Sequence, residues 1–368
     1  MNIKIKDSFL NLLKRGLWGN KQSSYSNFSL MDEEWFLIYD VAQAQTVEGI
    51  IYDGILTLPQ KSFPPYDLLM KWTARVDSIE RYNKKVRKAL AALAQGFYKN
   101  DLNFILLKGL GLAENYTKPL LRVSGDIDLY FDDYKKFDDA NDLLKSKGYN
   151  VSKGDHKSIF YHFNSVEVEH HTRMIDIFNP FCQKYIKELI LREKKNIKSI
   201  TVENQIIHVP SDLLNLVQTN AHILKHYMGF GVGLRQICDV ARLYNSLGKD
   251  FNGVELEEAY DVLGMRKWMN VIHNLLVDYI GLENSRLPIP ITRKVDTESL
   301  LLDILQSGNF GFHDVRFKSE GELLSKRYHK RDNVNKRVLP HIKKLLKLAP
   351  NEVFWFPVSK LYTKIIRR

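Results

Sequence analysis

The sequence predicts an α+β protein in which a small mixed β-sheet unit lies between two helical regions. Three observations support this fold class. Residues 1–100 space their apolar side chains as amphipathic helices do, residues 101–210 alternate short apolar runs with helical segments, and residues 211–368 return to helical spacing. Because 368 residues exceed one ordinary core, we expect two or three folding units.

The N-terminal region is expected to contain three helices. Residues 31–56 (MDEEWFLIYDVAQAQTVEGIIYDGIL) predict an amphipathic helix followed by a second helix that glycines interrupt. Residues 66–100 predict a long third helix, because apolar side chains recur along one face. The pattern changes at Asp101.

Short strands are expected in the middle region. FILLKG is a strand that ends at Gly109, GLGLAENYT is a helix candidate, and DIDLYF is a second strand. FDDANDLLKSKGYNV predicts a helix closed by Gly148 and then a further strand.

Two hairpins are expected to complete the sheet unit. HKSIFYHFNSVEVEHHT has Asn164 and Ser165 at its turn and alternating residues on its second arm. IKSITVENQIIHVP has Glu203 and Asn204 at its bend. Both segments belong to the predicted sheet unit.

The C-terminal region is expected to be helical. SDLLNLVQTNAHILKHY begins with Ser211 at a capping position, and LRQICDVARLYNSLG ends at Gly248. Helices continue to about residue 285. RLPIPI and the basic segment near residue 330 are interpreted as connections before a final helical stretch.

Composition excludes several classes of protein. With 44% hydrophobic and 26% charged residues the chain is typical of folded proteins. No window approaches the roughly 18 apolar residues of a transmembrane segment, and the first twenty residues lack a signal-peptide pattern, so we expect a cytoplasmic protein. Cys182 and Cys238 are too few for a disulfide framework or a cysteine zinc site.

The net charge of +11 favours polyanionic partners such as nucleotides, nucleic acid or an acidic membrane surface. The basic residues are spread along the chain, which is also typical of solvated helix faces. No RNA-binding aromatic motif or zinc finger accompanies them. Charge alone therefore does not indicate a nucleic-acid binder.

Two carboxylates stand two positions apart in RVSGDIDLYF. In a strand, Asp126 and Asp128 project to the same face, where they repel each other unless a cation lies between them. Oxygen ligands of this kind suit Mg²⁺ or Mn²⁺. A strand cap or a solvated edge is the structural alternative. An EF-hand is excluded, because Phe131 and Phe137 occupy the sixth and twelfth positions.

The context of these aspartates favours a site for phosphate. Upstream, FILLKGLG predicts a strand that turns at Lys108 and Gly109 into a helix, where backbone N–H groups can receive phosphate. Arg122 stands four residues before Asp126 and could bind a phosphate oxygen. The metal and phosphate interpretations therefore support each other.

The segment LLKGLGLAENYTKPLLRVSGDIDLYF resembles the nucleotidyltransferase superfamily of DNA polymerase β. It is most similar to the bacterial "uncharacterised nucleotidyltransferase" family, which has a Leu-Lys-Gly turn and an Arg before Gly-Asp-Ile-Asp. The similarity continues through VEVEHH and AHILKHYMGFGVGLRQICDVARLY, so it covers most of the chain. One departure is Lys-Gly where the superfamily more often has Gly-Gly or Gly-Ser.

The resemblance implies a third carboxylate in VEVEHHT. Glu169 best fits the family's pattern of valine, acid, any residue and histidine, and Glu167 is the alternative. Alternation in a strand places both on one face with His171, which we interpret as an orienting residue, a proton carrier or a surface histidine. The resemblance also implies nucleotide binding by Lys108, Gly109, Arg122 and Gly125.

Two histidines share one face of a predicted C-terminal helix. His222 and His226 are four residues apart, and Asp239 lies on the next helix. Packing of the two helices is the simpler interpretation, and no HExxH zinc motif is present. Because the resemblance reaches this region, we place these residues in an acceptor pocket or behind the metal ligands.

The predicted activity is a metal-dependent transfer of an NMP group from NTP to an acceptor, with release of pyrophosphate. One alternative is a glycosyltransferase that uses Asp-x-Asp and Mn²⁺ to bind a nucleotide sugar. The other is a non-catalytic nucleotide-binding module. The acceptor stays open among a small molecule, a polysaccharide precursor, RNA and protein, as do the base of the NTP and the oligomeric state.

Overall fold

A five-stranded mixed sheet positions the predicted site. The computed structural model describes residues 2–19, 29–153, 158–229, 231–314, 316 and 334–366. The strands are β1 (Ile105–Leu107), β2 (Ile127–Tyr130), β3 (Ser152–Lys153), β4 (Ile159–Phe163) and β5 (Val166–His171). Their order is β1-β2-β5-β4-β3, in which β2 and β5 are parallel and the other neighbours are antiparallel.

Both predicted hairpins are present. Asn164 and Ser165 connect β4 to β5, and both have positive φ, as a two-residue hairpin turn requires. Glu203 and Asn204 likewise connect β6 (Lys198–Val202) to β7 (Gln205–Val209), which form a separate two-stranded sheet. The turn residues in the sequence therefore placed both connections correctly.

The sheet has a different hydrophobic core on each face. Ile127, Leu129 and Val168 belong to the smaller core, which they share with the second half of α4 (Tyr66–Tyr98) and with α6 (Tyr134–Ser146). Leu107 and Tyr130 point the other way into the larger core. Because side chains alternate along a strand, Asp128 lies on the face of the larger core.

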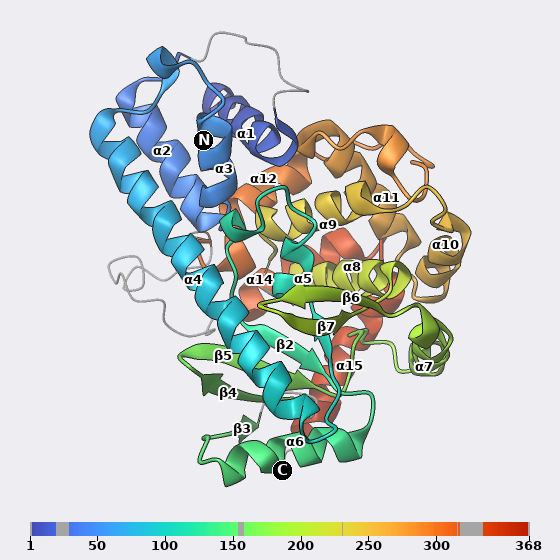
Figure 1. The fold of residues 1–368 in the computed structure, drawn as a ribbon. Helices are drawn as coiled ribbons and strands as arrows, with labels where there is room; N and C mark the ends of the chain where they lie inside the picture. Colours follow the sequence, from blue (N-terminus) through green and yellow to red (C-terminus); the bar gives the residue numbers. More distant parts are fainter. Residues whose placement is uncertain are drawn as a thin grey trace.

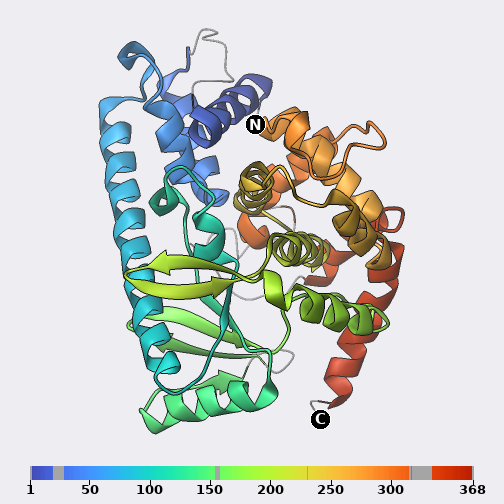
Figure 2. The ribbon, with the colours of Figure 1, turned by 45° about the vertical axis from the view of Figure 1, so that its right-hand side comes forward.

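Helix α4 extends from the N-terminal helices to the sheet, as Figures 1 and 2 show. Its apolar face contacts both cores. At its first half, α3 (Glu48–Ile55) packs on α4 and Tyr39 of α2 (Asp32–Ala44) contacts Trp72, while α1 (Ile3–Trp18) packs on α3. This confirms the predicted succession of helices in residues 31–100.

Short and longer helices connect the strands. The helix after β1 is α5 (Gly109–Ala113), the turn before β2 contains a 3₁₀ helix at Pro119–Leu121, and α7 (Cys182–Glu193) follows β5. Helix α6 begins after Asp133, whose side chain caps it, and ends before Gly148, whose φ is 81°.

The C-terminal region contains α8 (Asp212–Gly229), α9 (Leu234–Ser246), α10 (Gly253–Val262) and α11 (Arg266–Leu275), which continues as a π-helical turn to Ile280. Ser211 caps α8 by accepting the Leu214 N–H. After RLPIPI come α12 (Glu298–Ser307), α14 (Val334–Leu345) and α15 (Pro350–Ile366). The basic segment around residue 330 lies outside the described residues.

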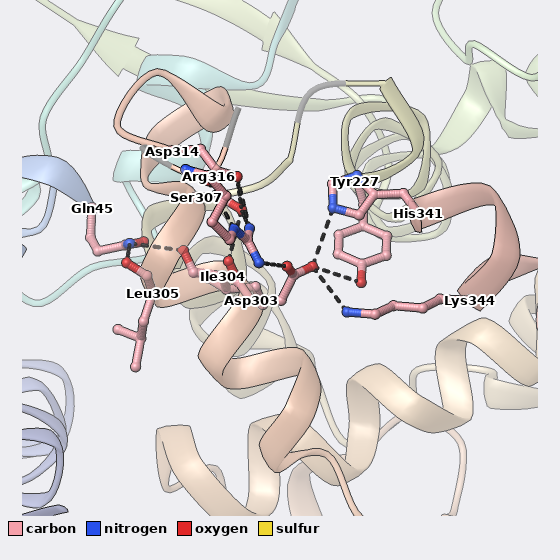
Figure 3. A network of polar contacts seen from close by, with 10 residues as sticks. All are labelled: Gln45, Tyr227, Asp303, Ile304, Leu305, Ser307, Asp314, Arg316, His341 and Lys344. Atoms are coloured by element: carbon pink, nitrogen blue, oxygen red, sulfur yellow. Dashed lines mark hydrogen bonds and ion pairs between the residues drawn. The ribbon is translucent and has the colours of Figure 1, made fainter. Parts of the chain in front are cut away.

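A buried carboxylate joins α12 to its neighbours (Figure 3). Asp303 accepts hydrogen bonds from Tyr227 of α8 and from Arg316, and it is paired with His341 and Lys344 of α14. On the other side, the Gln45 amide donates to the carbonyls of Ile304 and Leu305. These contacts fix α12 against helices that are distant in the sequence.

The structure confirms the predicted α+β class with a small mixed sheet. Side chains from residues 1–100, 101–210 and 211–368 all contribute to the larger core. We keep these three ranges as a proposed division of the chain. None of the helices in the described ranges combines the length and hydropathy of a membrane-spanning helix.

Candidate active site

The parallel pairing of β2 with β5 brings two predicted carboxylates together. Asp128 and Glu169 are register partners, so their side chains project side by side from one face of the sheet. Glu167 lies two residues earlier on β5 and is exposed. The structure therefore brings Glu169, the first choice from the sequence, closer to Asp128 than Glu167.

His171 completes this cluster. Its Nε2 lies 2.7 Å from Oδ1 of Asp128 and 3.6 Å from Oε2 of Glu169. One ligand atom from each of Asp128, Glu169 and His171 lies within 4.8 Å of the other two. In the part of the chain that the structure describes, these residues form a group with the spacing of metal ligands.

A strained turn holds Lys108 opposite the carboxylates. Lys108 connects β1 to α5 with φ 48° and ψ −142°, outside the common regions for a residue with a side chain. Its Nζ lies 3.4 Å from Oδ1 of Asp128. Gly109 follows with φ 36°, and a Cβ there would lie 3.3 Å from the Asp126 carbonyl oxygen. Glycine thus allows the turn to approach the aspartate segment.

Helix α5 is only five residues long. A helix of little more than one turn has a weak dipole. Lys108 is therefore the main positive group that this turn contributes.

The two aspartates have opposite electrostatic environments. The negative charge of Asp128, together with burial, raises the pKa of Asp126 to about 6. Burial alone would raise the pKa of Asp128, but Lys108 and His171 outweigh it and hold that pKa well below its usual range. Asp128 is therefore compensated within the protein, while Asp126 carries an unfavourable charge at neutral pH.

An ion pair that the sequence analysis missed lies beside Lys108. Lys225 of α8 donates to Asp176, with Nζ 2.6 Å from Oδ2. Burial would raise the pKa of Asp176, but Lys225 lowers it well below its usual value. Burial alone would lower the pKa of Lys108, but nearby carboxylates raise it. These belong to Asp128, Asp126, Asp176 and Glu169. MIDIF did carry a signal, since Asp176 interrupts an apolar run as in DIDLYF.

His222 of α8 lies near Lys108 and His171, and the His226 ring packs against His222 and Phe310. The rings of His222 and His226 have centroids 4.1 Å apart. Burial lowers the pKa of His222 well below its usual value, and nearby Lys108 and Lys225 contribute to the shift. His222 therefore lies near the lysines as a neutral imidazole.

Arg122 and Asp239 bind each other. The guanidinium makes two hydrogen bonds of 2.7 Å to the two carboxylate oxygens, and the Tyr116 hydroxyl donates to the same carboxylate at 2.8 Å. All three side chains are buried. This geometry favours a positioning role for Arg122 and Asp239 over the direct contacts with phosphate and acceptor that the sequence predicts.

Side chains from α4 and α9 hold the turn that leads into Asp126. The Asn83 side chain donates hydrogen bonds to the carbonyl oxygens of Leu120 and Arg122. Arg235 donates to the Val123 carbonyl, and Tyr82 donates to the Gly125 carbonyl. Gly125 itself is exposed, and a Cβ there would meet no atom within 4 Å. The turn is thus fixed from behind while its last residue stays accessible.

A mixed sheet with facing carboxylates on two parallel strands, beside a lysine-containing strand-to-helix turn, is the arrangement that the resemblance to nucleotidyltransferases implies. The chain belongs to the family described as uncharacterised nucleotidyltransferase, whose sequence model matches residues 31–276. This confirms the family that the motifs predict.

Among solved structures, the chain is similar to an antigenic nucleotidyltransferase-like protein from Paracoccidioides brasiliensis. The sequence identity is 17% and the TM-score is 0.34, and the match covers 54% of this chain and 92% of that chain. No curated protein matches the chain.

Proposed function

We propose that the protein is a metal-dependent nucleotidyltransferase that transfers a nucleoside monophosphate group from an NTP to a hydroxyl group of an acceptor. The bond between the α- and β-phosphates breaks, a bond from the acceptor oxygen to the α-phosphorus forms, and pyrophosphate leaves. The observation that carries this proposal is the facing pair Asp128 and Glu169, beside Asp126 and opposite Lys108.

The donor set fits a divalent cation. The cluster offers carboxylate oxygens from Asp128 and Glu169, which are the ligands that Mg²⁺ and Mn²⁺ prefer. The raised pKa of Asp126 supports the same assignment, because a cation would relieve its repulsion by Asp128. We assign Asp126, Asp128 and Glu169 as the residues that hold Mg²⁺ or Mn²⁺, which would supply charge stabilisation at the phosphates.

Lys108 and Gly109 are assigned to the nucleotide phosphates. Lys108 is the cation on the turn next to the carboxylates, and Gly109 permits the close approach of that turn. Exposed Gly125 leaves room for the nucleotide next to Asp126. Arg122 supports this side indirectly, since its guanidinium binds Asp239.

His171 is assigned two linked tasks. Its Nε2 contact with Asp128 fixes the orientation of that carboxylate, as residues behind metal ligands commonly do. The same nitrogen lies 3.6 Å from Glu169, so the ring also orients that carboxylate, which can take the proton that the acceptor hydroxyl loses. Glu167, on the same face but exposed, is assigned no direct role.

The proposal is tested by label transfer from each of the four α-³²P-labelled NTPs with Mg²⁺ or Mn²⁺, using a cell lysate as the acceptor pool. We expect pyrophosphate and labelled product in equal amounts. The double variant Asp126→Asn, Asp128→Asn should lose at least about 100-fold in rate. Asp132→Asn is the matched control, because Asp132 is paired with Lys194 outside the cluster.

Three results would count against the proposal. Unchanged transfer in the double variant would remove the aspartates from the reaction. Release of a nucleoside diphosphate from a nucleotide sugar, without pyrophosphate from NTP, would indicate the glycosyltransferase alternative. Metal-dependent NTP binding without any product would indicate the non-catalytic binding module.

A further inference from the structure

The ion pair of Lys225 with Asp176 is accessible to solvent. Lys225 belongs to α8, and Asp176 lies in the segment that follows β5. Their side chains are 29% and 33% exposed, and Nζ of Lys225 lies 2.6 Å from Oδ2 of Asp176. Glu169, in the carboxylate cluster, is exposed to a similar degree, at 31%. A molecule in solution can therefore reach both the ion pair and the cluster.

The charges of this pair act on the turn that holds Lys108. The Asp176 carboxylate is one of those that raise the pKa of Lys108. After burial and Lys225, the charges of Lys108 and His171 also act on the pKa of Asp176. Besides burial, both lysines lower the pKa of His222, so this ring lies near two ammonium groups. The two lysines thus approach one region from different elements, the turn after β1 and helix α8.

A second cation in this region meets a need that the nearby arginines do not meet. The β- and γ-phosphates of an NTP are commonly bound by cationic side chains in addition to the metal ion. The Arg122 side chain is 5% exposed, and its guanidinium binds both carboxylate oxygens of Asp239. Arg235 is buried and donates to the Val123 carbonyl. Lys225 is more accessible than either arginine.

The contact with Asp176 leaves Lys225 able to change partner. A partly exposed ion pair adds little to stability, because water and salt screen it. A lysine ammonium group has three donors on a flexible stem, so it can turn from a carboxylate to a nearby phosphate oxygen. The hydrogen bond to phosphate is again assisted by charge. Exchange of one anion for the other therefore costs little.

We propose that Lys225 binds the β- and γ-phosphates of the NTP, and that Asp176 holds its ammonium group in position before the nucleotide arrives. The proposal rests on the proposed nucleotidyl transfer and adds a phosphate-binding residue to it. When the bond between the α- and β-phosphates breaks, negative charge grows on the leaving pyrophosphate. Lys225 neutralises part of that charge.

The first test uses two probes that carry these phosphates. They are inorganic pyrophosphate and the α,β-methylene analogues of the four NTPs, which cannot be cleaved between the α- and β-phosphorus. Calorimetric titration with Mg²⁺ gives their dissociation constants. In Lys225→Met we expect both constants to rise at least about tenfold, and Lys225→Arg should lose less. Lys294→Met is the matched control and should bind both probes as the native protein does, because Lys294 is paired with Asp278 on the turn after α11.

The second test separates a phosphate contact from an ion pair that serves only the fold. Asp176→Asn removes the anion that competes with phosphate for Lys225, so it should bind both probes at least as tightly as the native protein. A purely structural pair would instead make Lys225→Met and Asp176→Asn weaken binding alike. The double variant Lys225→Met, Asp176→Asn leaves neither charge of the pair without its partner and replaces Lys225→Met if that variant folds poorly. It should bind both probes at least about tenfold more weakly than Asp176→Asn.

Three results would overturn the proposal. The first is unchanged dissociation constants in Lys225→Met, and the second is an equal loss in Lys225→Met and Asp176→Asn. The third is a double variant that binds both probes as tightly as Asp176→Asn. Failure of the native protein to bind any of the four analogues would reject the proposed function, and this proposal with it.

Discussion

Asp126 and Asp128 differ in charge compensation although they are two residues apart. Lys108 and His171 compensate Asp128, whereas Asp126 is mainly repelled by its neighbour. A pair of carboxylates with pKa values moved in opposite directions is typical of functional sites. We infer that the ammonium group of Lys108 takes the place of a metal ion beside Asp128 until metal and nucleotide bind.

Replacing Lys108 should separate metal binding from nucleotide binding. In Lys108→Met the cation that competes for Asp128 is gone, so Mn²⁺ affinity without nucleotide should rise by about tenfold, roughly 1.4 kcal/mol. NTP affinity should fall by a similar factor, because the lysine no longer contacts phosphate. Isothermal titration calorimetry measures both, and Lys108→Arg should keep NTP affinity closer to that of the native protein. Weaker Mn²⁺ binding in Lys108→Met would contradict this interpretation.

Residues that share a strand were predictable, and residues that pair across the fold were not. The two-residue period of strands placed Glu169 with His171 on one face of β5, whereas Asp126 lies one residue before β2 and outside the group of Asp128, Glu169 and His171. The pair Asp176 and Lys225 is separated by 49 positions. Such contacts depend on how α8 packs on the sheet, which no local pattern specifies.

At the scale of elements, a carboxylate of α15 fixes the segment that follows β5. Glu352 accepts the N–H groups of Phe178 and Asn179 at 2.7 and 3.0 Å. Burial raises the pKa of Glu352 to about 7, although these hydrogen bonds oppose the shift. This segment also contains Asp176, so α15 helps to hold the ion pair beside Lys108.

Glu352 should make stability depend on pH. Its folded pKa of about 7 exceeds the usual 4.5, so the folded state binds the proton more tightly. Stability should therefore fall as pH rises from about 4.5 to about 7, and then level off. Glu352→Gln should remove this dependence, which amounts to a change on the order of 2–3 kcal/mol in the free energy of unfolding over that pH range. Urea unfolding between pH 4.5 and 8 measures it, and equal pH slopes in both proteins would refute the assignment.

The sequence predicted most elements because their end signals are local. Two-residue turns placed both hairpins, and Ser211 marked the start of α8. Helix α12 was missed between two segments interpreted as connections, although ESLLLDILQS has helical spacing. The strand order and the parallel pairing of β2 with β5 follow from long-range packing, which spacing alone does not contain.

At the scale of the whole molecule, the ion pair of Arg122 with Asp239 joins the turn before β2 to α9. Both side chains are buried, and Arg235 of the same helix donates to the Val123 carbonyl. The C-terminal helices therefore hold the aspartate segment in place. We infer that the active site forms only when the sheet unit and the C-terminal helices are packed together.

Removing one partner of this ion pair should destabilise the protein more than replacing both partners with apolar residues. Asp239→Ala leaves the Arg122 charge buried without its partner, which should cost about 3–5 kcal/mol in the free energy of unfolding. The double variant Arg122→Met, Asp239→Leu should cost less than Asp239→Ala alone, because no charge stays buried alone. Urea unfolding of the single and double variants gives the comparison. A double variant less stable than Asp239→Ala would show that the pair itself supplies the stability.

We propose that Asp126, Asp128 and Glu169 hold a divalent cation together with the nucleotide. The most direct measurement is a titration with Mn²⁺ at pH 7.5, with and without NTP, in which electron paramagnetic resonance measures the binding. The matched variants are Glu169→Gln and Glu167→Gln, which make the same change two residues apart on β5. We predict that Glu169→Gln weakens Mn²⁺ binding at least about tenfold and that Glu167→Gln leaves it unchanged. Equal binding in the native protein and in Glu169→Gln, or loss only in Glu167→Gln, would contradict the account.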